Sequence, residues 1–430
     1  MSFARVESLD REGRGVAHVD GKAVFIDGAL PGEAVEFAPY QKKPAYDLAQ
    51  LLRVIEPSSA RVVPRCPYFL TCGGCSLQHM DERSQVAAKQ RVLEDALWHI
   101  GRVRAASMLA PIHGMQWRYR NRARLSARLV PRKGGVLVGF RERRSTFVAD
   151  MHGCEVVPAS VSEAIPKLRE LIGALSLADR VPQIEVAVGD EATVLVLRIL
   201  RPLTPPDEDL LRDFADANRI QMWLQPAGPE SAVPFWPRTV SLPAYVLPEF
   251  DLRIAFGPTD FTQVNHAVNR MLVRRALALL DPRPGERIGD FFCGLGNFTL
   301  PIARMGAAVT GYEGGEGLVR RARGNAESNG LQGACRFEVV NLFDPAACSR
   351  IPACDTALLD PPREGAVELV KSFAGRAPRR VVYVSCDPAT LARDAGVLVH
   401  VLGYDLSAAG VVNMFPHTSH VESVAVFERG

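Results

Sequence analysis

Two segments near the C-terminal end of the chain finish in polar residues that packing in a core does not explain. Asp360 follows the apolar segment TALL, and Cys386 follows RRVVYVS. A cysteine at a strand end is often a buried structural residue. Here, however, Cys386 precedes the turn-forming pair Asp387-Pro388 and opens toward the ligand edge of the predicted sheet. This context argues against a purely structural cysteine, and it places Cys386 one strand from a loop, Asp360 to Arg363, that can orient a polar heterocycle.

A glycine-rich turn earlier in the chain has the features of a nucleotide-binding loop. Gly294 and Gly296 separate the segment ERIGDFF from a helical segment, so the backbone can approach a ligand beside free N–H donors. A tight turn without a ligand is the simpler alternative. The next apolar segment ends in Glu313, where such a sheet places an acid that accepts hydrogen bonds from ribose hydroxyls. The third glycine of the dinucleotide motif is missing, and Asn297 with Phe298 favours an adenosylmethionine loop instead.

Four cysteines have the composition of a metal site. Cys66, Cys72 and Cys75 are crowded together, and Cys154 follows far downstream in the segment MHGC. Four thiolates suit either tetrahedral zinc or an iron-sulfur cluster, and the spacing alone does not decide between them. Coincidental proximity of three thiols fits poorly with the Cys-Gly-Gly-Cys turn. Nine cysteines in 430 residues suit a reduced compartment better than a disulfide framework.

A run of arginines indicates a basic surface in the middle of the chain. Arg118, Arg120, Arg122 and Arg124 alternate with other residues, and Lys133, Arg141, Arg143 and Arg144 follow. If this segment is a strand, all four guanidiniums of the run face one side. A solvated face is the ordinary alternative to phosphate contact. This much positive charge in one region favours RNA as the partner.

The elements that must position these residues differ along the chain. From Gly285 onward apolar strands alternate with helices, which predicts a parallel, doubly wound sheet with its ligands beyond the strand ends. Residues 1 to 58 hold short alternating segments and glycine turns, which predict a small antiparallel barrel. Between them we expect a helix over 81–100, with Val86, Gln90, Leu93, Leu97 and Ile100 on one face. Strands then follow between 111 and 250, and a turn-rich loop from Leu224 to Pro248.

Composition sets the class of protein. At 430 residues the chain is long enough for roughly three domains, and its 47% apolar and 23% charged residues predict folding throughout. No apolar run is long enough to span a membrane and the N-terminus has no signal-peptide core, so we expect a cytoplasmic protein without membrane contact. The net charge of +3 is mild, and its distribution matters more than its total.

Several of these motifs together resemble the RNA uracil-C5 methyltransferase family. The resemblance covers nearly the whole chain, and the opening VESLDREGRGVAHVDGKAVFIDGALPGEAVE resembles a TRAM domain, an RNA-binding barrel of the 23S ribosomal RNA branch. It predicts a TRAM barrel over 1–58, a central, mostly β domain with an iron-sulfur cluster over 59–255, and a Rossmann-like methyltransferase domain over 256–430. The motifs that carry it are Gln263-Val264-Asn265, Asp290 to Thr299, Asp360 to Gly365, Ser385 to Asp394, and Phe415 through Thr418 to Glu422.

The resemblance also implies roles for particular residues. Cys386 would be the nucleophile and Glu422 the base. A 4Fe-4S cluster would be held by Cys66, Cys72, Cys75 and Cys154, with a structural or RNA-positioning role. Asp387 stands where the family pattern leads us to expect Asn, and a carboxylate there is expected to disfavour the thiolate. The S-adenosylmethionine site would be lined by Gln263, Phe292, Asn297, Glu313 and Asp360, with Asn341 as a weaker candidate.

The implied reaction explains why these groups are needed. Uracil C5 is a poor nucleophile, so a thiolate must first add to C6 and make an enolate before C5 can take a methyl group. A base must then remove the C5 proton, and the target uridine must be turned out of the RNA to reach the thiolate. Asp360 and Arg363 are candidates to bond the uracil edge or the enolate.

The expected product is 5-methyluridine in 23S ribosomal RNA, made by a monomer. The alternatives are a tRNA uracil-C5 methyltransferase, which usually lacks the barrel and the cysteines, and an RNA-binding protein with an inactive methyltransferase domain. Cys386 and Glu422 are both present, which disfavours an inactive domain. A small-molecule methyltransferase would leave the barrel and the arginines unexplained.

Overall fold

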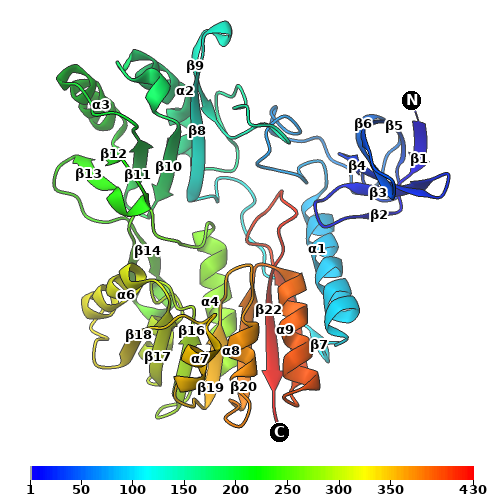
Figure 1. Ribbon diagram of the computed structural model, residues 1–430, viewed down its shortest axis with the longest axis vertical. Helices are drawn as coiled ribbons and strands as arrows, with labels where there is room; N and C mark the ends of the chain where they lie inside the picture. Colours follow the sequence, from blue (N-terminus) through cyan, green and yellow to red (C-terminus); the bar gives the residue numbers. More distant parts are fainter. Residues whose placement is uncertain (1) are drawn as a thin grey trace.

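The computed structural model describes residues 2–430. Its N-terminal part is a six-stranded sheet that curls back on itself (Figure 1). Its order is β1-β5-β6-β4-β3-β2, so the edges are two strands that only Val6 and Glu7 separate. The Val6 amide donates to Glu33 O (2.9 Å) and the Glu7 amide to Val16 O (2.7 Å), which closes the barrel. The strands are β1 (Ser2–Arg5), β2 (Ser8–Leu9), β3 (Gly15–Val19), β4 (Lys22–Asp27), β5 (Ala34–Lys42) and β6 (Tyr46–Glu56).

The barrel is not purely antiparallel, and the prediction is wrong on this point. Strands β4 and β6 pair in parallel, from Ala23 opposite Tyr46 to Asp27 opposite Gln50. The chain crosses over between them through β5, which pairs with both β1 and β6. Closure by this crossover leaves no long exposed edge for another chain to pair with.

Helix α1 (Glu82–Ala96) follows the cysteine segment and continues into a π-helical turn over Leu97–Gly101. Asp81 caps it by accepting a hydrogen bond from the Ser84 amide (3.1 Å), and the expected helix is confirmed. Its buried face is different from the one predicted. Gln85 and Lys89 are buried with Leu93 and Ala96, whereas Ile100 is 42% exposed. The helix is therefore rotated to bury two polar side chains.

The central region is a second six-stranded sheet, of order β13-β12-β11-β10-β8-β9, covered by two helices. The predicted strands at β8, β9, β10 and β11 are confirmed. The region also contains two helices that were not predicted, α2 (Ala159–Ala174) and α3 (Pro205–Asn218), so it is not mostly β. The strands are β8 (Arg122–Val130), β9 (Gly135–Gly139), β10 (Gln183–Val188), β11 (Thr193–Arg198), β12 (Gln221–Gln225) and β13 (Val233–Trp236).

The expected loop from Leu224 to Pro248 is also wrong in part. It holds the end of β12, the edge strand β13 and the strand β14 (Ala244–Leu247), which pairs with β15 (Leu252–Ala255). Strand β13 contains Pro234 and lies at the sheet edge, where a missing N–H donor costs no ladder bond. The prolines between these short strands gave the segment the pattern of turns.

The C-terminal part is an eight-stranded sheet of order β18-β17-β16-β19-β20-β22-β21-β7, and the doubly wound prediction is confirmed. Strands β16 to β20 run parallel, and β22 is antiparallel to β20 and β21. The strands are β16 (Arg287–Phe291), β17 (Ala308–Glu313), β18 (Cys335–Val339), β19 (Thr356–Leu359), β20 (Arg380–Ser385), β21 (Asp405–Val412), β22 (Glu422–Glu428) and β7 (Ser107–Met108).

Helices cover both faces of this sheet. Leu358 and Val382 pack on one face against α4, α5 and α6, while Leu359 and Val381 pack on the other against α1, α8 and α9. Successive strand residues point to opposite faces, so continuous apolar runs are needed, as the sequence has them. The helices are α4 (His266–Leu280), α5 (Thr299–Arg304), α6 (Glu316–Ser328), α7 (Pro345–Arg350), α8 (Val367–Lys371) and α9 (Pro388–His400).

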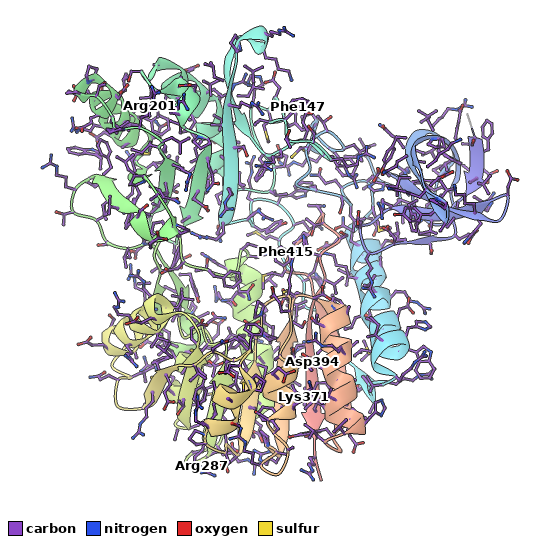
Figure 2. All side chains as sticks on the ribbon, viewed as in Figure 1. Phe147, Arg201, Arg287, Lys371, Asp394 and Phe415 are labelled. Carbon is purple, nitrogen blue, oxygen red and sulfur yellow. The ribbon has the colours of Figure 1, made fainter. Side chains whose placement is uncertain are left out.

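The loop between β21 and β22 connects the three regions. It extends from the ends of β21 and β22 toward the central sheet and the upper end of α1. Phe415 lies at this meeting point (Figures 1 and 2). None of the helices in residues 2–430 combines the length and apolar character that crossing a membrane requires.

Candidate active site

Strand register brings Cys386 and Glu422 together. Strands β20 and β22 pair antiparallel with Ser385 opposite Ser423, and the Ser423 hydroxyl donates to Ser385 O (3.3 Å). Cys386 directly follows this last pair on one strand and Glu422 directly precedes it on the other, and the charge of Glu422 contributes to the raised pKa of Cys386. Glu422 is only 2% exposed, and Cys386 is half-buried. The thiol and the carboxyl group thus share one end of the sheet.

Burial raises the pKa values of the acidic groups at this end of the sheet. Burial is the largest cause that raises the pKa of the Cys386 thiol to about 12. The nearby carboxylates of Glu422 and Asp360 act in the same direction, whereas Arg363 lowers this pKa. Burial and Asp360 raise the pKa of Glu422 well above its ordinary range. Burial also raises the pKa of Asp360 to about 7, against a side-chain hydrogen bond with Gln263. These four predicted residues, Gln263, Asp360, Cys386 and Glu422, therefore lie within mutual electrostatic reach.

Asp387 does not have the effect expected from its sequence position. Its carboxylate caps helix α9 by accepting hydrogen bonds from the amides of Ala389 (2.8 Å) and Thr390 (3.3 Å). The charges that raise the pKa of Cys386 come from Glu422 and Asp360 instead. The carboxylate of Asp387 is thus engaged at the helix N-terminus, and it is not among the leading causes of the raised pKa of Cys386.

The glycine loop follows β16 as predicted, and its backbone explains the glycines. Phe292, Gly294 and Gly296 have φ values of 64°, 53° and 90°, a left-handed conformation that glycine adopts without strain. Glu313 ends β17 and accepts hydrogen bonds from the amides of Gly294 (3.1 Å) and Gly315 (2.9 Å). Its carboxylate thus joins the two loops that would flank a nucleoside.

Asn297 is held by two residues that the sequence analysis missed. Its side chain exchanges two hydrogen bonds with Asn269 of α4 (2.8 and 3.0 Å) and accepts a third from the Tyr245 hydroxyl (2.8 Å). Asn269 follows the motif residue Asn265 by four positions, so helical spacing could have indicated it. Below them the buried Asp290 accepts a hydrogen bond from Thr299, and burial raises its pKa to about 7.

Asn341 and Phe292 lie at the other end of the glycine loop. Asn341 is exposed and accepts a hydrogen bond from the Phe343 amide (3.1 Å). The rings of Phe292 and Phe343 are 5.6 Å apart, centroid to centroid. Asn341 is thus connected to Phe292 only indirectly, since Phe343 contacts both of them.

The four predicted cysteine ligands line one cavity of about 80 Å³. Burial raises the pKa of Cys72 to about 11 and that of Cys75 to about 12, and each feels the charge of Cys154. Within residues 2–430, no group of three His, Cys, Asp or Glu side chains is arranged to hold a metal ion. The four thiols share this cavity, and sulfur donors of this kind suit either tetrahedral zinc or an iron-sulfur cluster.

The predicted row of arginines is wrong as a single face. Strand β8 begins only at Arg122, and Arg118 has a φ of 59°, so the four residues do not share a strand. Arg118 donates to Cys154 O (3.2 Å) and Arg122 to Pro258 O. Arg124 pairs with Glu185 (2.8 Å). Arg120 lies beside the cysteine cavity, so these residues act largely within the protein.

Arg143 and Arg144 also have partners inside the molecule. They form ion pairs with Asp27 of the barrel, at 3.0 and 2.7 Å, and Tyr40 donates to the same carboxylate (3.0 Å). The Arg143 amide in turn donates to Thr71 O (2.8 Å). These contacts join the barrel to the cysteine segment.

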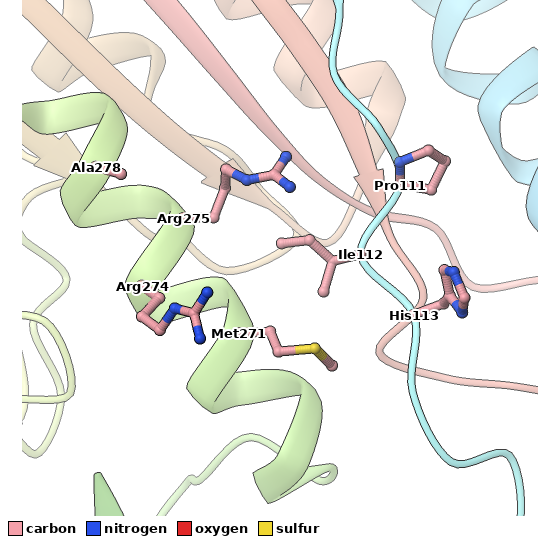
Figure 3. A pocket seen from close by; sticks show the side chains of 7 residues that line it. All are labelled: Pro111, Ile112, His113, Met271, Arg274, Arg275 and Ala278. Carbon is pink, nitrogen blue, oxygen red and sulfur yellow. The ribbon is translucent and has the colours of Figure 1, made fainter. Parts of the chain in front are cut away.

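A larger cavity of about 300 Å³ lies outside the candidate active site, between α4 and residues 111–113 (Figure 3). Arg274, Arg275 and His113 line it together with Met271 and Ile112. None of the predicted site residues lines it, so this cavity is separate from both the methyl-donor loops and the Cys386 end of the sheet.

Comparisons with known proteins agree on one family. Residues 350–430 match the family described as tRNA (Uracil-5-)-methyltransferase, and residues 4–36 match the TRAM domain. The chain is 59% identical to a protein of Aromatoleum aromaticum and 57% identical to one of Dechloromonas aromatica, with all of each chain covered. Both relatives are named 23S rRNA (uracil(1939)-C(5))-methyltransferase RlmD.

A solved structure shares the fold over the whole chain. It is the Pyrococcus abyssi tRNA (uracil-54, C5)-methyltransferase in complex with S-adenosyl-L-homocysteine, with a TM-score of 0.76 and 24% identity. The alignment covers 99% of this chain and 100% of the other.

Proposed function

We infer that this chain, which belongs to the RlmD family of 23S rRNA (uracil-C5)-methyltransferases, transfers a methyl group from S-adenosylmethionine to C5 of a uridine in 23S ribosomal RNA. The names of the relatives specify uracil 1939, and we propose the corresponding uridine as the target. Full-length relatives with this name disfavour the tRNA alternative.

The observation that carries the mechanism is that Cys386 and Glu422 both adjoin the Ser385–Ser423 pair, close enough for the charge of Glu422 to raise the pKa of Cys386. We propose that the Cys386 thiolate adds to C6 of the uracil and drives the electron pair to C5. S-adenosylmethionine supplies the electrophilic methyl group. Glu422 then takes the proton from C5, the electron pair returns to the ring, and the C6–Sγ bond breaks to release the thiolate.

The raised pKa values suit these roles. A carboxylate with a pKa well above its ordinary range is a stronger base once it is ionised, which helps it to take a proton from carbon. The thiol must lose its proton against a pKa of about 12 in the free enzyme. A positively charged sulfonium nearby would favour the thiolate, so we expect the nucleophile to be formed only when the methyl donor is bound.

We propose that the methyl donor lies along the loops after β16 and β17, with Phe292, Asn297 and Glu313 as its contacts and Asn341 at the edge. Asp360 and Gln263 would join this site to the uracil site, since their side chains interact with each other beside Cys386. The side chains of Asn297 and Glu313 are already hydrogen-bonded within the protein, which supports a site that is ordered before the methyl donor binds.

The test of this function uses purified protein, labelled S-adenosylmethionine and unmodified 23S rRNA. Label should appear as 5-methyluridine at one position, and 5-fluorouridine there should trap a covalent protein-RNA species, because fluorine does not leave as a cation. A tRNA transcript is the matched substrate control. Equal methylation of tRNA, or a trapped species that survives in a Cys386→Ala protein, would overturn the proposal.

We propose that Cys66, Cys72, Cys75 and Cys154 hold a 4Fe-4S cluster, on the support of their common cavity. The thiolates would supply its ligands, and its role would be structural, since it lies outside the methyltransferase sheet. Protein purified without air should contain about four irons per chain, and Cys154→Ser should lose them. Stoichiometric zinc without iron would contradict this assignment.

We further propose that residues 1–58, 59–255 and 256–430 act as RNA-binding barrel, cluster-bearing unit and methyltransferase unit of a monomer in the cytoplasm. The three larger sheets support this division in outline, although β7 (Ser107–Met108) of the second unit pairs at the edge of the methyltransferase sheet. The match to a TRAM domain supports RNA binding by the first unit. Light scattering of the protein with and without an RNA fragment tests the monomer.

A further inference from the structure

The loop of residues 413–421 ends at the proposed base. It joins β21 to β22, and its two ends meet where Val412 pairs with Glu422. A loop closed in this way transmits any change in its shape to the first residue of β22. The position of Glu422 against Cys386 therefore depends on what holds this loop.

Two buried polar residues of helix α1 hold it. Lys89 is 2% exposed, and its Nζ donates to Asn413 Oδ1 (2.8 Å) and to Phe415 O (2.8 Å). Gln85 is 1% exposed, accepts a hydrogen bond from the His417 amide (2.8 Å) and contacts His417 Nδ1 (3.3 Å). The side-chain amide of Gln85 also donates to Leu77 O and Met80 O, which fixes its orientation.

The cysteine segment and the central region also contact this loop. The amides of Ser76 and Leu77 both donate to His417 O (2.9 Å each), and the Ser419 amide donates to the Ser76 hydroxyl (2.9 Å). The Trp117 ring stacks on His417 with centroids 3.9 Å apart. His417 is thus fixed on three sides, by α1, by the residues after Cys75 and by Trp117.

Packing alone does not explain Lys89. Burial lowers the pKa of its amino group to about 7, and no carboxylate within residues 2–430 offsets that burial with an opposite charge. A buried amine without a counter-charge costs folding free energy that an apolar side chain of similar length would avoid. What the amine provides is two donors aimed at two points of one loop, and costly polar placements of this kind are typical of functional sites.

We propose that Lys89 and Gln85 are positioning residues for the methylation reaction, holding the loop 413–421 so that Glu422 faces the C5 proton after methyl transfer. The inference rests on the proposed role of Glu422. It gives α1, which lies outside the motifs of the methyltransferase sheet, a part in the second half of the reaction.

The test separates methyl transfer from product release in single turnovers. Lys89→Met keeps the length of the side chain and removes both donors. We expect methyl transfer to stay within about threefold of the wild-type rate, while elimination slows by about tenfold or more, in line with the loss of one or two buried hydrogen bonds. A methylated covalent protein-RNA species should therefore accumulate. Arg91→Met, on the exposed face of the same helix, is the matched control and should leave both rates unchanged.

A second measurement needs no RNA. Hydrogen exchange at the His417 amide, which donates to Gln85, should speed up in Gln85→Leu and in Lys89→Met but not in Arg91→Met. Equal slowing of transfer and elimination, or unchanged exchange at His417, would show a merely structural role and overturn the inference. If Lys89→Met does not fold, Gln85→Leu carries both measurements. Failure of the wild-type protein to trap 5-fluorouridine RNA at Cys386 would instead overturn the proposed function itself.

Discussion

Polar groups at the two halves of this end of the sheet differ in whether they already have hydrogen-bond partners. On the donor side, defined as the loops after β16 and β17, Asn297 is bonded to Asn269 and Tyr245, and Glu313 to two backbone amides. On the reaction side, defined as Asp360, Cys386 and Glu422, burial raises all three pKa values, and the charge of Asp360 adds to this effect at Cys386 and Glu422. No hydrogen bond among residues 2–430 lowers the pKa of Glu422.

This difference separates recognition from chemistry. A binding loop gains from being ordered in advance, because less conformational freedom is lost when the ligand arrives. Groups that must exchange protons or form bonds gain from being held in an environment that does not already satisfy them. The polar groups of the donor side are thus already hydrogen-bonded before the ligand binds. The groups of the reaction side are buried at a cost in folding free energy that substrate binding would offset.

The largest expected effect is at Cys386. Cys386→Ala should lower turnover by on the order of 10⁴-fold or more, since nothing else activates C5. Binding of S-adenosylmethionine, measured by calorimetry, should be unchanged if the two sides are independent. The buried Cys293 of the donor side provides the control, and Cys293→Ala should remain active. Normal turnover in Cys386→Ala would show that the reaction side is misassigned.

Glu422→Gln should lower turnover by about 10²- to 10³-fold by blocking release while methyl transfer continues. Denaturing electrophoresis with labelled methyl donor should show a covalent species. In the wild type, release should weaken as the pH falls through the raised pKa of Glu422, because a protonated carboxyl group accepts no proton. A release step in the variant that keeps this pH dependence would assign the base elsewhere.

Asn269→Ala sharpens the comparison from the donor side. It removes the side chain that shares two hydrogen bonds with Asn297, so affinity for S-adenosylmethionine should fall by about tenfold. RNA affinity and the rate of transfer at saturating donor should not change. A loss of transfer rate at saturation would show that the two sides are coupled.

The smallest effect concerns stability at Asp360. Its raised pKa means that the folded state binds the proton more tightly, so stability declines as the pH rises from about 4 to about 7. Asp360→Asn should raise the unfolding free energy by about 1 to 2 kcal/mol at pH 8 and by less at pH 5.5. Thermal unfolding at both pH values measures this. Asp355→Asn is the opposite control, because Arg287 lowers the pKa of Asp355 and its loss should destabilise the fold.

Sequence patterns predicted the elements whose apolar periodicity is strong. Buried parallel strands such as β19 and β20 are continuous apolar runs, and Asp360 and Cys386 stand at their ends because sheets collect function there. The strand pairing that brings Glu422 close to Cys386 could not be predicted, because β22 lies between β20 and β21, out of chain order. Only the family motif indicated Glu422.

Other parts failed for local reasons. Gln85 and Lys89 are polar, so helical periodicity assigned them to the solvent face, and only the distant loop that they bond explains their burial. Arg118 and Arg120 alternate like strand residues, yet the left-handed backbone at Arg118 breaks the pattern before β8 begins. A periodic pattern predicts a regular element only where the backbone is regular.

The contacts of the loop 413–421 also bear on how the enzyme is made. Lys89 and Asn413 lie 324 residues apart in the chain, and Gln85 and His417 lie 332 apart. During synthesis α1 leaves the ribosome before β21 and β22, so its two buried polar side chains stay unpartnered until those strands have emerged. Contacts of such long range form late. The enzyme that modifies ribosomal RNA therefore completes its own catalytic end only after β22 has been synthesised.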